Sequence, residues 1–190
     1  MSRYHNAEII CPVCKKKNIV RVWDSVNVDI NPEIKEDILS GKFNHSICPS
    51  CNVEINCVYG FLYHDMKHRY MVGIEHDYTT ALLMTDCPDG YRFRRVKDIN
   101  GLIEKINIFE LELNDIVIEM VKKIVMETSN RYSKLLFCTI ENNNMIFMFA
   151  DQPAKGIFIP IRIYDFALKK CSKADLDEKP EFMIVDQDTN

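Results

Sequence analysis

The chain has 190 residues, of which 47% are hydrophobic and 27% are charged, and its formal net charge is −4. This composition is ordinary for a soluble globular protein and excludes collagen, a coiled coil, a disordered chain and a small disulfide-stapled protein. The N-terminal residues lack the apolar core of a secretory signal, and no apolar run approaches the roughly 20 residues that cross a bilayer. We therefore expect a cytoplasmic protein that does not enter a membrane.

The distribution of charge gives little sign of a nucleic-acid partner. Basic and acidic residues nearly balance in the first half of the chain, and the acidic excess lies in the second half. Binding to phosphates through counterion release needs a basic excess that no segment carries. Two short basic clusters, Lys15–Lys17 and Arg92–Arg95, are interpreted as local patches exposed to solvent.

The first half of the chain is predicted to consist mainly of strands. Residues 19–30 alternate between two faces and are rich in β-branched side chains, which predicts a strand with a bulge near Asp24–Ser25. Asn31 as a cap and Pro32 at the first helical position then favour a short helix that ends at Gly41. Two further strands are predicted at residues 53–63 and 69–75, and residues 64–68 are expected to form the turn between them.

The second half begins at a turn signal over residues 86–90 and is predicted to contain both helices and strands. A short amphipathic helix is expected after Asp98, and a longer one from Asn114–Asp115 to about Asn130. The asparagine-rich loop at 141–144 tolerates left-handed backbone and predicts a hairpin. The expected strands lie at residues 134–140, 145–150 and 157–164, the last being an edge strand because it contains Pro160.

Two Cys-Pro-x-Cys motifs are the strongest functional signal. Cys11 and Cys14 belong to the first motif, and Cys48 and Cys51 belong to the second. Two residues between cysteines let both thiolates face one point from a tight turn, whose backbone N–H groups can donate to the sulfurs. Two such turns supply four soft ligands in a tetrahedron, which is the geometry of structural zinc sites. We therefore predict that these four cysteines hold a structural Zn²⁺.

Other chemistries of the same cysteines are kept as alternatives. Residues 15–47 separate the two motifs, a longer interval than is usual for zinc fingers, and the predicted strand and helix account for its length. Iron in the same four sulfurs and a redox-active thiol pair are the alternatives to zinc. Cys14 is followed by three lysines and a β-rich run rather than by a helix, which argues against a thioredoxin-like motif. Four sulfur ligands leave no open position for water, which argues against zinc catalysis.

Around these motifs the chain resembles the CpXC family of bacterial and archaeal proteins. The matching stretches are IICPVC at 9–14, VWDSVNVD at 22–29, NPEIKEDILSG at 31–41, ICPSC at 47–51, FLYHDM at 61–66 and the helical region around 96–124. The resemblance covers about two thirds of the chain, ending between residues 126 and 130. It implies zinc ligation by Cys11, Cys14, Cys48 and Cys51 and implies no particular activity.

Three histidines close together in the sequence form a second candidate site: His64, His68 and His76. His64 and His68 have the spacing of the zincin motif, but that motif needs a helix, whereas the flanks here alternate like strands. We therefore interpret residues 64–68 as a hairpin loop and keep an enzyme that uses the three histidines as an alternative hypothesis. Nearby aromatic residues are predicted to pack in the core, namely Trp23, Phe61, Tyr63 and Tyr70.

Together these features predict an α+β protein with two regions. Residues 1–90 are expected to form a zinc-ribbon-like β unit, and residues 91–190 an α+β region with two helices, a β-hairpin and a C-terminal tail. The leading hypothesis for function is a non-enzymatic module that binds a protein partner or a second copy of itself. A zinc ribbon that binds nucleic acid is a further alternative, which rests on analogy of fold alone.

Overall fold

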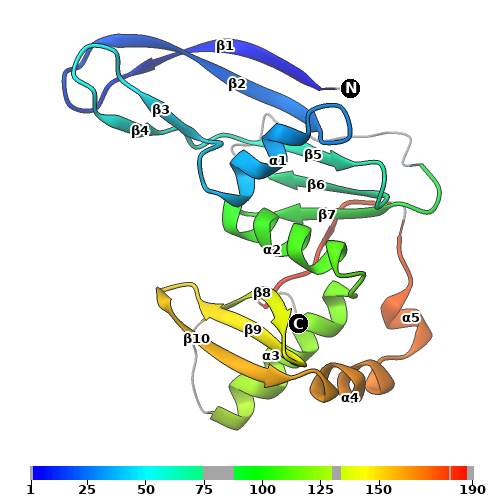
Figure 1. The fold of residues 1–190 in the computed structure, drawn as a ribbon. Coiled ribbons are helices and arrows are strands. Elements are labelled where there is room, and N and C mark those ends of the chain that lie inside the picture. The colour runs from blue at the N-terminus through cyan, green and yellow to red at the C-terminus, as the bar shows by residue number, and fades with distance from the viewer. Residues whose placement is uncertain (1, 75–87, 130–133, 180, 188–190) are drawn as a thin grey trace.

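The computed structural model describes residues 2–74, 88–129, 134–179 and 181–187. It contains a six-stranded sheet, a three-stranded sheet and a two-stranded ribbon, together with helices, so the predicted α+β class is confirmed. Figure 1 shows the large sheet and the small sheet on opposite sides of helix α2 (Ile99–Glu110). No helix in the described part of the chain is long and apolar enough to cross a membrane.

The large sheet joins strands that are far apart in the sequence. Its order is β1-β2-β5-β6-β7-β11. The strands are β1 (Arg3–Ile10), β2 (Lys17–Asn27), β5 (Phe61–Asp65), β6 (Tyr70–Ile74), β7 (Arg92–Val96) and β11 (Met183–Ile184). The pairings β1–β2 and β5–β6 are antiparallel, whereas β2–β5, β6–β7 and β7–β11 are parallel. The sheet therefore contains strands from both sides of residue 90, and the division into two regions at that point stays a prediction.

The predicted strand, bulge and helix between residues 19 and 41 are present, but the strand ends at Asn27 rather than at residue 30, and residues 28–30 form a turn. Ser25 pairs with Arg3 and Trp23 pairs with Tyr4, so that Asp24 is the extra residue of a bulge in β2. Helix α1 (Pro32–Leu39) begins with Pro32 at its first position, and Gly41 follows it with a left-handed φ of 74°. The expectation that Asn31 caps this helix is wrong, because its side-chain amide donates to Glu33 and not to the helix backbone.

The strand predicted at residues 53–63 is two strands in two different sheets. β4 (Glu54–Asn56) pairs with β3 (His45–Ile47) in the separate ribbon, whereas β5 begins at Phe61 in the large sheet. Ile55 packs beside the cysteines, and Phe61 packs in the main core. The apolar pattern continues through both strands, so the sequence gives no sign that they serve two cores. The next strand, predicted at 69–75, is β6, and residue 75 lies outside the described residues.

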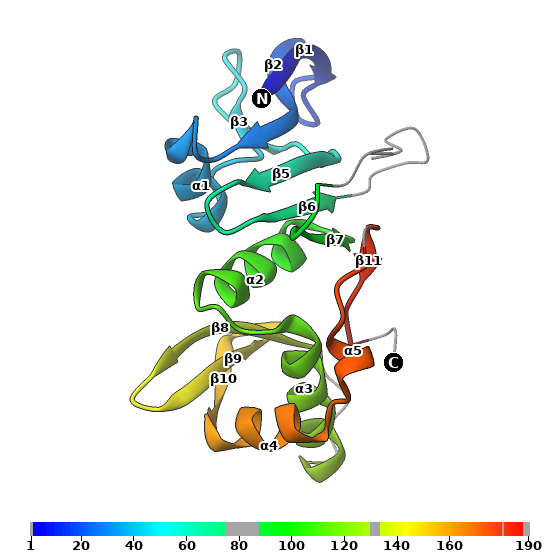
Figure 2. The same ribbon diagram turned by 90° about the vertical axis from the view of Figure 1, so that its right-hand side faces the viewer.

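Two helices that follow the large sheet begin at the predicted caps. The Asp98 side chain accepts a hydrogen bond from the Gly101 N–H at the start of α2. The Asn114 side chain accepts from the Ile116 N–H at the start of α3 (Asp115–Ser129). The predicted end of this helix at Asn130 lies outside the described residues. α2 contacts both β6 and β8, which places it as a layer between the sheets (Figure 2).

The small sheet has the order β10-β9-β8, with β8 (Leu135–Glu141), β9 (Asn144–Phe149) and β10 (Gln152–Pro160). Its predicted hairpin is confirmed, since Asn142 and Asn143 both have positive φ. Pro160 ends an edge strand, as predicted. The expectation that this strand runs to residue 164 is wrong. The strand ends at Pro160, and helix α4 (Arg162–Lys170) follows and buries Tyr164 and Ala167. A short helix α5 (Lys173–Leu176) and then β11 follow.

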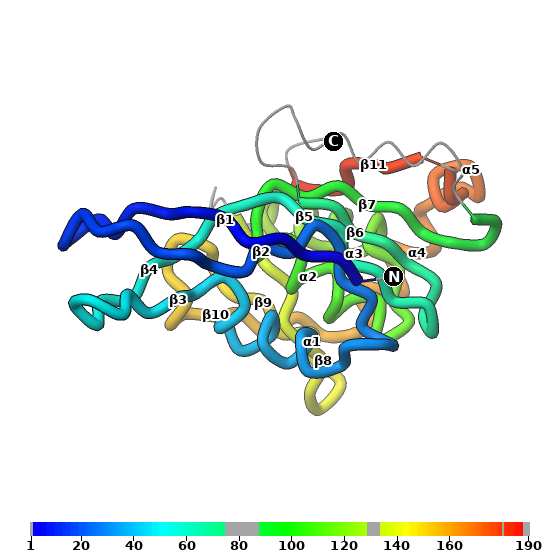
Figure 3. The backbone as a smooth tube through the Cα atoms, turned by 90° about the horizontal axis from the view of Figure 1, so that it is seen from above, coloured from blue at the N-terminus to red at the C-terminus, as the bar shows by residue number. Residues whose placement is uncertain are grey.

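One part of the molecule projects from the rest. Figure 3 shows the turn of the β1–β2 hairpin and the β3–β4 ribbon extending side by side beyond the sheets. We call residues 7–20 and 45–57 the cysteine arm, because both Cys-Pro-x-Cys motifs lie in it. The remaining elements, packed around the main hydrophobic core, are called the body.

Candidate metal centre

The two cysteine motifs form turns with the same hydrogen bonds. In the first turn the Cys11 N–H donates to the Lys16 carbonyl (2.9 Å), and the Lys15 N–H donates to the Cys11 carbonyl (3.0 Å). In the second turn the N–H of Cys48 donates to the Val53 carbonyl (2.9 Å), and the N–H of residue 52 donates to the carbonyl of residue 48 (2.8 Å). The fifth residue of each turn has a positive φ, 60° at Lys15 and 57° at residue 52. The sequence thus builds one local structure twice.

These turns bring the four predicted sulfur atoms together. The Sγ atoms of Cys11 and Cys51 are 3.6 Å apart, as are those of Cys14 and Cys48. All four sulfurs lie within 4.8 Å of one another. A disulfide bond needs about 2.05 Å, whereas four sulfurs at about 2.3 Å from a zinc ion lie about 3.8 Å apart in a tetrahedron. The arrangement therefore fits a metal tetrahedron and not a pair of disulfides.

The cluster has its own small core, separate from that of the body. Cys11 and Cys48 are fully buried, Cys14 is half-buried and Cys51 is exposed. Ile55 is the further buried residue of this core, with Ile9 and Val53 packed against it. So few apolar side chains bury little surface, and a metal bound by the four sulfurs would supply much of what holds the two turns together.

Backbone donors and neighbouring sulfurs act in opposite directions on the thiols. Burial raises the pKa of Cys48, but hydrogen bonds from the backbone N–H groups of Ser50 and Cys51 outweigh it and lower that pKa to about 6. The Val53 N–H lowers the pKa of Cys51, but burial and the neighbouring sulfurs outweigh it and raise that pKa to about 12. Repulsion therefore builds up as the sulfurs ionise, and a cation placed between them would remove it.

The two predicted histidines that the structure describes are not brought together. His64 lies in β5, where its ring packs against Tyr91 and its Nε2 is 3.5 Å from the Tyr91 hydroxyl. His68 lies in the turn before β6, with its Nδ1 2.9 Å from Asp65. Because His64 and Asp65 are successive residues of a strand, they point to opposite faces, so His64 and His68 do not share a site. The predicted hairpin is confirmed, although its turn covers residues 66–69 rather than 64–68, and His76 lies outside the described residues.

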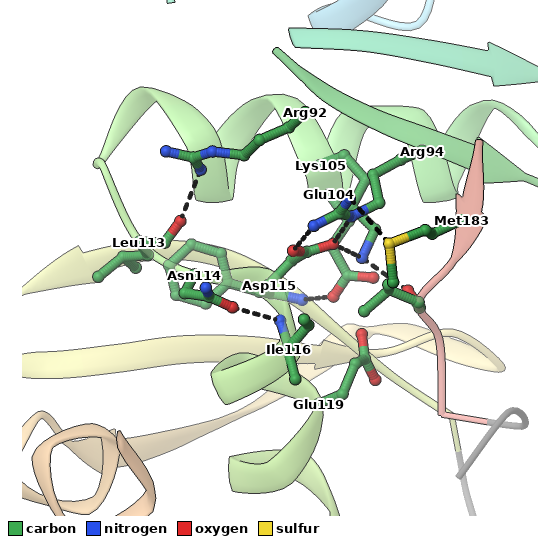
Figure 4. Close-up of polar contacts among 12 residues, drawn as sticks. Arg92, Arg94, Glu104, Lys105, Leu113, Asn114, Asp115, Ile116, Glu119 and Met183 are labelled. Atoms are coloured by element: carbon green, nitrogen blue, oxygen red, sulfur yellow. Dashed lines mark hydrogen bonds and ion pairs between the residues drawn. The ribbon is translucent and has the colours of Figure 1, made fainter. Parts of the chain in front are cut away.

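The interpretation of the arginine cluster as solvent-exposed is wrong for Arg94, which is fully buried. Its guanidinium makes two hydrogen bonds to Asp115, of 2.7 and 2.9 Å (Figure 4). It makes two more to Glu178. Lys105 also donates to Asp115, at 2.7 Å. Residues 92–96 read Arg-Phe-Arg-Arg-Val, which does not alternate between charged and apolar residues, so no local pattern indicates that Arg94 is buried in strand β7. Its carboxylate partners lie too far along the chain to be inferred. The lysines at 15–17 are exposed, as predicted.

The four aromatic residues predicted to be core are buried, namely Trp23, Phe61, Tyr63 and Tyr70. Among the described residues, two groups of side chains have the geometry to hold a metal ion: the four cysteines, and Asp65 with His68 and Glu110. The second group includes one predicted histidine, His68, with carboxylates that the sequence analysis did not single out.

Comparison with known proteins agrees with the cysteine geometry. Searches of curated proteins and of solved structures gave no significant match. The family model described as CpXC protein matches residues 9–122, which is more than half of the chain and includes both cysteine turns. With four cysteines positioned to hold a metal ion and this match across them, the chain belongs to the CpXC family.

Proposed function

We propose that this protein binds one structural Zn²⁺ through Cys11, Cys14, Cys48 and Cys51, and that the metal-stabilised cysteine arm docks onto another protein. The observation that carries the proposal is the convergence of four thiols from two turns of identical hydrogen bonding, with 3.6 Å between sulfurs. Soft thiolates in a tetrahedron favour zinc, and a site with four protein ligands holds metal without leaving a position for substrate.

The surface of the arm supports a role in protein binding. Four large apolar side chains on or beside the cysteine turns are mostly exposed, at 62% for Ile10, 64% for Val13, 76% for Ile19 and 59% for Ile47. Exposed apolar side chains gathered in one region are typical of surfaces that contact another protein. In the described part of the chain β1 is an edge strand of the large sheet, and an edge strand can pair with a strand of another protein.

The metal is tested by elemental analysis of protein purified without chelator. We expect one zinc per chain in the wild type and none in the double variant Cys48→Ser/Cys51→Ser. The matched control is Cys138→Ser/Cys171→Ser, two cysteines of the body, which should keep the zinc. Iron with visible charge-transfer absorption would replace zinc in the proposal, and metal-free protein that cycles between thiols and disulfides would overturn it.

The partner is tested with a photoreactive amino acid at position 13 on the arm. We expect one specific protein, or a second copy of the chain, to be cross-linked from position 13. The matched control is position 155, an exposed lysine on the far edge strand β10, which should give no such product. The cross-link should also vanish in the Cys48→Ser/Cys51→Ser variant. Nucleic acid recovered in a salt-sensitive manner would instead favour the ribbon as a nucleic-acid binder.

A further inference from the structure

A second set of metal-ligating groups lies in the body, where three elements meet. Asp65 ends β5, His68 lies in the turn to β6 and Glu110 ends α2. One ligand atom from each residue lies within 4.8 Å of the other two. Figure 1 shows α1 in front of β5 and β6, and α1 also contacts α2. One imidazole nitrogen and two carboxylates are a donor set of intermediate hardness, which suits a divalent ion such as Mn²⁺.

A lysine ammonium already occupies the position of a cation. Lys35 reaches from α1, and its Nζ lies 3.6 Å from the Asp65 carboxylate and forms an ion pair with Glu110. The Asp65 side chain is 3% exposed, whereas those of Lys35, His68 and Glu110 are 20–34% exposed. The buried carboxylate is thus reachable from solvent through partly exposed groups, and the flexible lysine can leave without moving the backbone.

Two tyrosine hydroxyls beside the carboxylates give an independent sign that the site is incomplete. Tyr63 and Tyr70 are fully buried, and among the described residues neither hydroxyl has a hydrogen-bond partner. Tyr63 shares the sheet face of Asp65 two residues on, and Tyr70 is the cross-strand partner of Asp65. Burial is the largest cause that raises the pKa of both hydroxyls, the two tyrosines also act on each other, and the charges of Asp65 and Glu110 raise both pKa values further. An unpaired buried hydroxyl is costly, and a hydrated ion would offer it water ligands.

We propose that Asp65, His68 and Glu110 form a second metal site, which takes a hydrated divalent cation of the Mn²⁺ class when Lys35 swings out. The tyrosine hydroxyls would face the water ligands of that ion. This inference does not rest on the proposed function, because none of its residues belongs to the cysteine arm.

The test uses full-length protein whose cysteines are first saturated with zinc, and then follows Mn²⁺ binding by electron paramagnetic resonance. We expect one Mn²⁺ per chain in addition to the zinc. His68→Gln and Glu110→Gln should each weaken binding at least about tenfold, the scale seen when even an outer partner of a metal ligand is lost. Lys35→Met should strengthen binding by about tenfold, because it removes a positive charge a few ångströms from the ion.

The matched control is Glu36→Gln, which removes an exposed carboxylate of α1 next to Lys35 in the sequence and should leave Mn²⁺ binding unchanged. His68 and Glu110 are partly exposed, so thermal unfolding should show that their variants fold. If the cluster were only a network of ion pairs, Lys35→Met would lower stability and bind no Mn²⁺. That result, or wild-type binding that the two ligand substitutions leave unchanged, would overturn the proposal.

Discussion

The cysteine arm and the body differ in what lies next to their buried ionisable groups. In the body each buried cation lies against carboxylates of the same chain, as Arg94 does with Asp115, and Lys122 with Glu104 and Glu119. In the arm the sulfurs of Cys11, Cys14, Cys48 and Cys51 lie against one another, and charge there needs a cation from outside. The body therefore pairs these buried charges within the chain, whereas under the proposed zinc site the arm would take its cation from outside.

Removing the metal should give the largest effect and should separate the two regions. Structural zinc contributes about 10 kcal/mol or more to the folding of small zinc modules. We expect a chelator to unfold the arm while the body keeps its cooperative unfolding transition. Hydrogen exchange measures this directly, as fast exchange of the backbone N–H groups of Cys11, Cys48 and Asn52 beside persistent protection of α2. Loss of protection in α2 at the same chelator concentration would show that arm and body are one cooperative unit.

Two neighbouring lysines of α3 test the internal charge pairing of the body. Lys122 is buried, with its Nζ 2.7 Å from Glu104 and 2.8 Å from Glu119, whereas Lys123 is exposed. Lys122→Met leaves two buried carboxylates without their cation and should cost about 3–5 kcal/mol of unfolding free energy. Lys123→Met should change it by less than about 0.5 kcal/mol. Urea denaturation compares the two, and equal effects would contradict the pairing.

Acid should destabilise the body through Asp115. This carboxyl is fully buried, and although burial opposes ionisation, Lys105 and Arg94 hold its pKa well below the usual range. A lowered carboxyl pKa stabilises the fold above the unfolded value of about 3.9, and this stability is lost as the pH falls toward the folded value. Urea midpoints measured between pH 5 and pH 2 should fall steeply, with a shallower slope in Asp115→Asn.

Glu119 should show a small effect of the opposite sign. Burial raises its pKa despite the attraction of Lys122, and no group in the described part of the chain makes a hydrogen bond to its Oε2. A raised carboxyl pKa means that the charge costs stability at neutral pH, so Glu119→Gln should stabilise by up to about 1 kcal/mol at pH 7. This gain should vanish at low pH, where Glu119 is itself neutral. Glu104→Gln is the matched control and should destabilise, because it removes the negative charge of the Glu104 oxygen that both pairs with Lys122 and accepts the Phe137 N–H.

Features set by neighbouring residues could be predicted from the sequence. The two cysteine turns, the Asp98 and Asn114 caps and the hairpin at Asn142–Asn143 each depend on a few consecutive residues. The convergence of the cysteines could be predicted as well, because a metal tetrahedron is a reason for two identical turns to meet. The interpretation of residues 64–68 as a hairpin succeeded for the same local reason.

Features set by distant partners could not be predicted. Arg94 looks like a surface residue until Asp115 and Glu178 are placed beside it, and neither lies near it in the sequence. The two strands on either side of Gly60 share one apolar pattern, and only their separate cores distinguish them. The possible metal group of Asp65, His68 and Glu110 forms only because the end of α2 packs near the β5–β6 turn. No local sequence pattern predicts that contact.

The place of β11 has a consequence for the order in which the protein matures during synthesis. The cysteine arm is complete once residue 57 has left the ribosome, so it can capture metal while most of the chain is still unmade. The body must wait, because β7 pairs with β11, and Arg94 and Lys105 find Glu178 and the Val185 carbonyl only near the end of translation. The proposed zinc site is therefore available first, and the large sheet of the body is completed last.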